Sequence, residues 1–308
     1  MNTWNLFQLM VVLFAMMLAG YGAYRKNLID DSAYTKICGL IVHIFNPMLI
    51  ISGVVGKDLS QTGSLISQNL LLVVILFAYL VFVSGPVTAL LRIPKEKRPL
   101  HQLMLIFSNL GFMGIPLITS LYGSEKVIFV SFYILVFNIL AYTLGIYLLG
   151  KGQGQKKAFS FRKIVNTGTI ACVAAIVLFY CHIPVAQPVL TFVSYMGNTA
   201  VPLSMMMIGV SLAKSNLGAL LRQVSRYKFM VVKMLVLPIV IILILKQFSF
   251  DNTLLGIFLL MIAMPVASVV PMLAELYGKP GDSQEAAQMV ALTTVISLIT
   301  LPLVSLAL

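Results

Sequence analysis

The sequence predicts an all-α integral membrane protein of ten transmembrane helices, built as a 5+5 inverted-topology repeat in which spans 4 and 9 are broken. Three observations lead to this prediction. The 308-residue chain has only 10% charged residues and a mean hydropathy of +1.00, whereas soluble domains carry about 25% charge. Apolar runs of about 20 residues, long enough to cross a bilayer, recur along the whole chain. The two halves also share sequence segments at a constant offset.

The apolar runs divide the chain into ten expected spans with short connections. The first run has no basic residue before it and no small-residue cleavage site, so we expect a retained helix rather than a signal peptide. The longest connection, GKGQGQKKAFSFRK at 150–163, is basic and falls at the midpoint of the chain. The expected spans are residues 4–23, 36–55, 65–91, 101–121, 127–149, 164–182, 188–212, 225–246, 252–275 and 285–307.

An internal repeat links the two halves of the sequence. The segment IPLITSLYG at 115–123 recurs as VPMLAELYG at 270–278, an offset of 155 residues. The same offset carries Pro47 of NPMLIISG onto Pro202 of VPLSMMMIG. Two proline-containing spans in register at one offset indicate two homologous halves of five spans each.

An odd number of spans in each half, 1–150 and 156–308, makes the second half run through the membrane in the opposite sense, as in many secondary transporters. The basic residues agree with this topology. Seventeen of the 21 Lys and Arg residues lie in odd-numbered loops, which places those loops in the cytoplasm and both termini outside. Topology therefore explains the net charge of +12, and we expect no nucleic-acid partner.

Spans 4 and 9 carry residues that interrupt a helix. The segment Asn109–Ile115 contains two glycines and is followed by Pro116, a favoured residue for the first turn of a new helix. Pro265 and Pro271 bracket a similar gap that contains Ser268. Each break would place a half-helix N-terminus, with free N–H groups and partial positive charge, near the bilayer midplane. Such paired breaks predict an anion-transport site.

Spans 2 and 7 also contain proline beside polar residues, with Asn46 before Pro47 and Asn198 and Thr199 before Pro202. Prolines in membrane helices often only kink them. A simple kink and a contribution to the site therefore both stay open for these two spans.

Several motifs together resemble one known family of transporters. SNLGFMGIPL followed by LYG, GNTAVPLSMMMIG in span 7 and MPVASVVPMLAELYG in span 9 are similar to the auxin efflux carrier family, which includes bacterial malonate- and malate-type permeases and the plant PIN exporters. The resemblance covers essentially the whole chain. It implies crossing broken helices in spans 4 and 9 and elevator-type alternating access. Spans 1, 2, 6 and 7 would form a dimerising scaffold, and spans 3–5 and 8–10 the moving transport unit.

The resemblance also implies the substrate and the residues that bind it. Family substrates are small organic anions, such as malonate, malate or auxin-like acids, whose carboxylate lies near the crossover. The residue at the 155 offset from Asn109 is Met264, so the expected site is asymmetric, and Ser268 or Ser108 would supply a hydroxyl. The expected binding residues are Asn109, Gly111, Gly114 and Pro116 from span 4, Ser268 and Pro271 from span 9, and Asn46 and Asn198 facing them from the scaffold.

Charged groups inside the spans are few. No Asp or Glu falls near the middle of a span, which disfavours a cation pathway. His43 is either a packing residue or a proton-coupling group. Lys233 either snorkels to the cytoplasmic interface or attracts anions electrostatically. Three scattered cysteines show no metal spacing, and we expect neither a metal nor a cofactor.

We therefore expect a secondary transporter of small organic anions in the cell membrane, with membrane lipid and a second copy of the chain as partners. Two alternatives use a similar fold: an anion channel, and a sodium/proton-type cation exchanger. We do not expect an enzyme, because the sequence has no HExxH or GxSxG motif and no paired mid-span carboxylates.

Overall fold

The computed structural model describes residues 3–55, 63–151, 165, 167–181, 185–214 and 224–308. Within these residues the chain is helical, and its β-type pairing is one isolated antiparallel bridge between Ser108 and Val266. The prediction of an all-α protein is thus confirmed. Most of the predicted mid-chain connection 150–163 lies outside the described residues.

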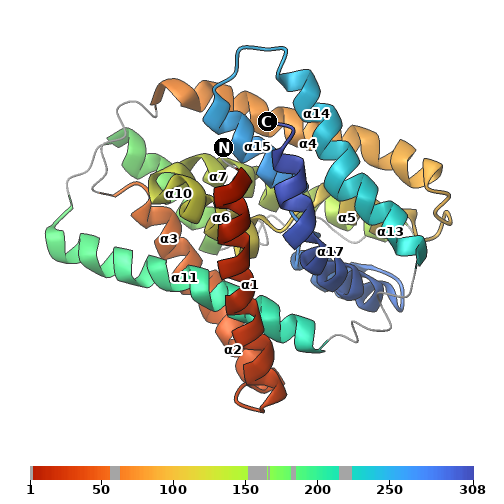
Figure 1. Cartoon of the computed structure of the whole chain (residues 1–308), viewed down its shortest axis with the longest axis horizontal. Helices are drawn as coiled ribbons and strands as arrows, with labels where there is room; N and C mark the ends of the chain where they lie inside the picture. Colours follow the sequence, from red (N-terminus) through yellow and green to blue (C-terminus); the bar gives the residue numbers. More distant parts are fainter. Residues whose placement is uncertain (1–2, 56–62, 152–164, 166, 182–184, 215–223) are drawn as a thin grey trace.

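The described residues of the first half form eight α-helices and four short helical turns, and Figure 1 shows their arrangement. The α-helices are α1 (Thr3–Arg25), α2 (Asp31–Leu40), α3 (Asn46–Ser52), α4 (Gly63–Leu90), α5 (Arg98–Ile106), α6 (Ile115–Tyr122), α7 (Val127–Leu140) and α8 (Ile146–Lys151). The turns are the π-helical η1 (Ile41–Phe45), η2 (Leu110–Gly114) and η4 (Ala141–Gly145) and the 3₁₀ turn η3 (Ser124–Lys126).

The second half continues with long helices on both sides of a further interruption. Its described elements are α10 (Thr167–Cys181), α11 (Gln187–Lys214), α13 (Val224–Val231), the π-helical η5 (Val232–Val236), α14 (Leu237–Leu245), α15 (Asn252–Ala263), α16 (Val269–Tyr277) and α17 (Asp282–Ser305).

Seven helical segments of the described chain are long and apolar enough to cross a membrane by length and composition. Three shorter apolar helices, Leu110–Tyr122, Thr167–Leu178 and Asn252–Ala263, accompany them. The first and third belong to the two regions where breaks are predicted, so their shortness has a local cause. The described residues thus have the makeup of a multi-pass membrane protein.

Glycines allow α1, α3 and α11 to pack with their backbones in close approach. A Cβ atom at Gly20 would overlap the backbone of Met206 on α11, and one at Gly209 would overlap the backbone of Met17 on α1. A Cβ atom at Gly197 would lie 2.9 Å from the Cα atom of Leu49 on α3. Small residues at such contacts are the usual means of helix association in lipid. These three helices therefore form one tightly packed group.

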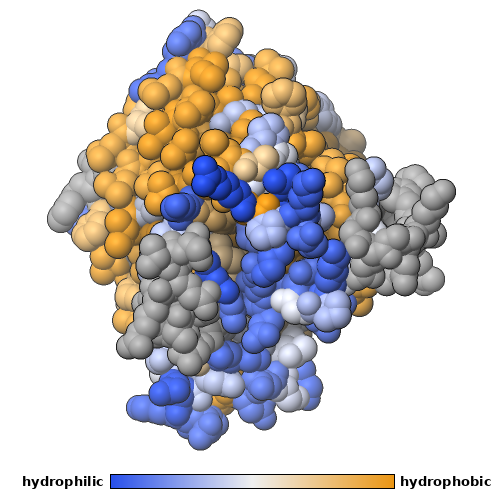
Figure 2. All heavy atoms as spheres, turned by 90° about the vertical axis from the view of Figure 1, so that its right-hand side faces the viewer, coloured by the Kyte–Doolittle hydropathy of each residue, from blue (hydrophilic) through white to orange (hydrophobic). Residues whose placement is uncertain are grey.

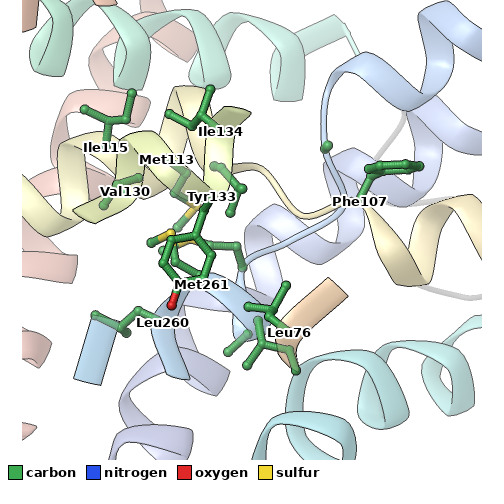
Figure 3. Close-up of a cluster of buried hydrophobic side chains, with 14 of the residues drawn as sticks. Leu76, Phe107, Met113, Ile115, Val130, Tyr133, Ile134, Leu260 and Met261 are labelled. Atoms are coloured by element: carbon green, nitrogen blue, oxygen red, sulfur yellow. The ribbon is translucent and has the colours of Figure 1, made fainter. Parts of the chain in front are cut away.

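A second group of helices packs around a large apolar core. Figure 3 shows side chains of η2, α6, α7 and α15 gathered around Tyr133, which is fully buried. The labelled members are Leu76, Phe107, Met113, Ile115, Val130, Tyr133, Ile134, Leu260 and Met261. The half-helix that follows the break in span 4 is thus anchored on one side by apolar packing.

Three of the π-helical turns immediately precede a proline in the first turn of the next helix. The turns are η1, η2 and η5, and the prolines are Pro47, Pro116 and Pro238. Proline lacks an N–H and its ring clashes with the carbonyl four residues earlier. A wider π turn relieves this clash. In α11, by contrast, the helix continues through Pro202, so span 7 has no break there.

Candidate functional site

The break in span 4 begins at Phe107, four residues before the first glycine of the predicted gap. Helix α5 ends at Ile106, residues 107–109 are not helical, and the helix begins again with η2 at Leu110. The expected gap between Gly111 and Pro116 is therefore wrong in position. The two glycines lie inside the π turn, and Pro116 lies in the first turn of α6.

The break in span 9 faces the break in span 4. Helix α15 ends at Ala263 and α16 begins at Val269. The Asn109 N–H donates to the Pro265 carbonyl at 2.8 Å, and the Ala267 N–H donates to the Phe107 carbonyl at 3.0 Å. The two segments thus satisfy each other's backbone groups, which is required where no water is available.

Two helix N-termini begin at this antiparallel pairing. One is the start of η2 at Leu110, and the other is the start of α16 after Ser268. The N–H groups of a first helical turn have no carbonyl partner within the helix and carry partial positive charge. Both N-termini therefore favour an anion.

Lys233 lies behind the first break and is fully buried, with 1% of its surface exposed. Its Nζ donates to the Leu105 carbonyl and to the Ser108 Oγ, each at 3.1 Å. The ion pairs found among the described residues do not involve it. The snorkelling interpretation is therefore wrong, because the ammonium points into the protein. It caps the C-terminal end of α5 and holds the Ser108 hydroxyl at the break.

A cavity of about 340 Å³ opens beside the two breaks. Its walls come from α2 and α11 on one side and from the two broken regions and α17 on the other. Its polar lining residues are Tyr34, Cys38, Asn109, Ser211, Lys214, Ser268 and Thr294, and its apolar ones are Phe112, Met207, Ile208, Leu212, Pro271, Ala287, Val290 and Ala291. This volume is in the usual range for a small-molecule site.

A family model described as membrane transport protein matches residues 5–305, nearly the whole chain. The chain belongs to this family. The match confirms the resemblance to the auxin efflux carriers, and together with the apolar helices it makes the chain a multi-pass membrane transport protein. A comparison with curated proteins gave no match.

Three of the predicted site residues line the cavity of this transport protein. Asn109 is buried, with 3% of its surface exposed, and its Nδ2 has no hydrogen-bond partner. Ser268 is exposed at the N-terminus of α16, and Pro271 lies in the first turn of that helix. A buried amide without a partner is costly in a folded protein. The free Asn109 donor at the cavity thus suggests a ligand acceptor.

The other residues predicted from span 4 lie within the half-helix and do not line the cavity. Gly114 is buried, and a Cβ atom there would lie 3.3 Å from the Met261 Cε. Gly111 faces Asn46: a Cβ atom at Gly111 would lie 4.0 Å from the Asn46 Nδ2. Asn46 is buried, and its Oδ1 has no partner. Asn46 therefore borders the half-helix without lining the cavity.

Two predicted residues lie away from the cavity. Asn198 is exposed on α11. His43 is exposed within η1, and its Nδ1 lies 2.8 Å from the Thr167 Oγ1. Neither residue lines the cavity.

Sequence reasoning missed the cation that lines the cavity. Lys214 ends α11, forms an ion pair with Asp31 at 2.9 Å and lies 4.6 Å from the centre of the Tyr34 ring. In the sequence, Lys214 looks like any other basic residue beside a loop. Nothing in the neighbouring sequence indicates that the end of α11 packs against α2.

Proposed function

We propose that this transport protein is a secondary transporter of small organic anions and that the substrate carboxylate binds where the breaks of spans 4 and 9 meet. The observation that carries the proposal is the cavity beside the breaks, where the buried Asn109 amide has a donor with no partner. A carboxylate oxygen would accept that donor. The two helix N-termini and the Ser268 hydroxyl supply further donors.

The charges around the cavity favour an anion over a cation. Lys214 lines the cavity, while its ion-pair partner Asp31 does not, and no carboxylate is found among the residues that form the cavity wall. Cation pathways in membranes are usually marked by a buried acid. The sodium/proton-type exchanger is therefore the weaker alternative.

The two sides of the cavity support an elevator-type movement. The α2 and α11 side corresponds to the proposed scaffold of spans 1, 2, 6 and 7. The broken regions and α17 correspond to the proposed transport unit of spans 3–5 and 8–10. A site at the border of two helix groups gains access to opposite membrane sides when one group moves relative to the other. Ten crossings and an inverted repeat of 1–150 and 156–308 are part of this proposal.

The remaining expectations concern the membrane location, orientation and oligomeric state of the transporter. We propose that it lies in the cell membrane with both termini outside and the basic odd-numbered loops in the cytoplasm. A homodimer through the scaffold follows from the family resemblance and is proposed with it.

A thermal-shift screen of organic acids on the purified full-length protein tests the substrate class, since a ligand that binds the folded state stabilises it by mass action. The panel would contain mono- and dicarboxylates, their amides and simple cations. We expect stabilisation by at least one carboxylate and none by its uncharged amide. The proposal fails if no organic anion in a broad panel binds or is moved.

Uptake into proteoliposomes separates a carrier from an anion channel. We expect saturable uptake of the labelled acid and exchange against unlabelled acid on the other side. Single-channel currents with flux that does not saturate would support the channel instead.

A further inference from the structure

A second cavity of about 360 Å³ lies where α4, α5, α13 and α17 come together, and it shares no lining residue with the transport cavity. We call it the basic cleft. Its lining includes four Lys or Arg residues, one histidine and a single carboxylate. These charged or titratable members are Arg92, Lys97, His101, Arg226, Lys228 and Glu285, and the others are Leu91, Ile93, Pro94, Phe229 and Met289.

The one carboxylate in the basic cleft already has partners. Glu285 accepts from Lys97 at 2.8 Å, and its other oxygen lies 3.6 Å from the His101 Nε2. Arg92, Arg226 and Lys228 take part in none of the ion pairs found among the described residues. The cleft therefore retains several positive charges that no acid of the described chain balances.

Arg226 has the strongest requirement for a ligand. Its Nη2 donates to the Gln288 Oε1 at 2.7 Å, but its Nη1 is buried and has no hydrogen-bond partner. A guanidinium is a planar fork of donors that matches the oxygens of a phosphate or carboxylate group. A phosphate oxygen in the cleft would accept from this orphaned donor.

The backbone at Arg92 also departs from the ordinary pattern. Arg92 has φ +55°, in the left-handed region that glycine occupies without cost. For a residue with a side chain this conformation costs roughly 1–2 kcal/mol. The Ile93 N–H donates to the Thr88 carbonyl at 3.1 Å, so this conformation ends α4 and turns the chain at Arg92 into the wall of the cleft.

Apolar surface continues outward from the basic cleft. Leu90, at the end of α4, is 82% exposed, and Leu91 lines the cleft itself. Figure 2 shows the face on the right of Figure 1, where α4 ends and α13 begins; hydrophilic residues gather across its middle, with hydrophobic residues above them. A ligand with an acidic head and an apolar tail would meet both kinds of surface.

We propose that the basic cleft binds the phosphate group of an anionic membrane phospholipid, with the acyl chains beside the end of α4. The proposed topology places this cleft at the cytoplasmic leaflet, where basic pockets between helices bind acidic head groups. The site is separate from the transport cavity. It joins helices of spans 3, 4, 8 and 10, so a bound lipid would hold α5, the helix that precedes the first break, against its neighbours.

A lipid titration of the purified full-length protein in neutral detergent tests this proposal independently of any transport activity. The measured quantity is the unfolding temperature with added phosphatidylglycerol, zwitterionic phosphatidylcholine or inorganic phosphate. We expect phosphatidylglycerol to raise it by several degrees and the other two to have little effect at equal concentration. Equal stabilisation by phosphatidylcholine, or full stabilisation by inorganic phosphate, would overturn the assignment to an anionic lipid.

Substitutions then locate the lipid. Arg226→Gln should raise the phosphatidylglycerol concentration needed for half the stabilisation by at least about tenfold, because it removes a charged donor to phosphate. Arg25→Gln is the matched control, since Arg25 is exposed at the end of α1 and does not line the cleft. Lys228→Gln at the exposed part of the cleft is a second variant should Arg226→Gln fail to fold. A wild-type response in a folded cleft variant would refute the site.

Discussion

Asn109 is the side chain on which the proposed anion site depends most. Asn109→Ala removes a buried donor that has no protein partner, so the fold loses little and the ligand loses a hydrogen bond. Hydrogen bonds to charged groups contribute about 1.5–3 kcal/mol, and the carboxylate Kd should therefore rise roughly 10- to 150-fold. The measurement is a ligand titration followed by thermal shift.

Asn198→Ala is the control for that substitution. Asn198 is also an asparagine predicted from the sequence, but it is exposed and does not line the cavity. We expect it, like His43→Ala, to leave the Kd unchanged. A loss of affinity in Asn198→Ala equal to that in Asn109→Ala would contradict the assignment of the site.

Lys233 is a residue whose environment the sequence did not reveal. A buried ammonium is costly, but Lys233→Met also leaves the Leu105 carbonyl and the Ser108 hydroxyl without this donor. Because the two effects oppose each other, the unfolding temperature should stay close to that of the wild type. The carboxylate Kd of this variant should also rise, because the substitution removes the donor that holds the Ser108 hydroxyl next to Asn109.

The control for Lys233→Met is Lys246→Met. Lys246 is exposed, and its Nζ donates to the Ala307 carbonyl at the end of the chain. Lys246→Met should alter neither the unfolding temperature nor the carboxylate Kd. If Lys233→Met lowered the unfolding temperature sharply and left the Kd of the folded protein unchanged, Lys233 would be a structural residue only.

Residue types alone predicted part of the cavity lining. Asn109, Ser268 and Pro271 were expected and line the cavity, because local interruptions in a repeat identify them. Lys214 and the burial of Lys233 were not predictable, because both depend on which helices meet in space. The sequence of a single span does not show which other helices pack against it.

At the scale of elements, the sequence predicted which two spans contain breaks but not where the first break begins. The glycines and Pro116 suggested a gap at 111–116. In the structure, residues 107–109 leave the helix to pair with 265–267. The pairing with residues 265–267 determines the position of the gap, and the glycines allow the π turn that follows.

Helix α1 offers a test of the close packing against α11. Gly20→Ala places a methyl group against the backbone of Met206, so the two helices must separate. Overpacking of this kind costs about 1–3 kcal/mol, and the unfolding temperature in detergent should fall. Gly22→Ala, two residues away on the same helix, has nothing within 4 Å of its new methyl group and should have no such effect. Equal unfolding temperatures for the two variants would contradict the packing.

At the scale of the whole molecule, composition and charge predicted the membrane class and a topology. The class follows from hydropathy because lipid tolerates few other sequences. The number of crossings is harder to predict, because broken helices such as those of 98–122 and 252–277 combine pieces too short to span the bilayer alone.

The proposed topology is tested by cysteine labelling. Cys181 is exposed at the end of α10, which the proposed topology places outside the cell. Cys38 is half-buried at the end of span 2 that this topology places in the cytoplasm, and Cys172 is buried. A membrane-impermeant maleimide applied to intact cells should label the protein, and Cys181→Ser should abolish that labelling. Labelling that requires permeabilised cells would reverse the proposed orientation.

The most direct test of the proposed carboxylate site is uptake of labelled organic acids into proteoliposomes that contain the wild-type protein or Asn109→Ala. We expect saturable uptake of at least one carboxylate by the wild type and exchange with the same unlabelled acid. We also expect a marked loss of uptake at low substrate concentration in Asn109→Ala. Absence of uptake across a broad panel of organic anions, or wild-type uptake in Asn109→Ala, would contradict it.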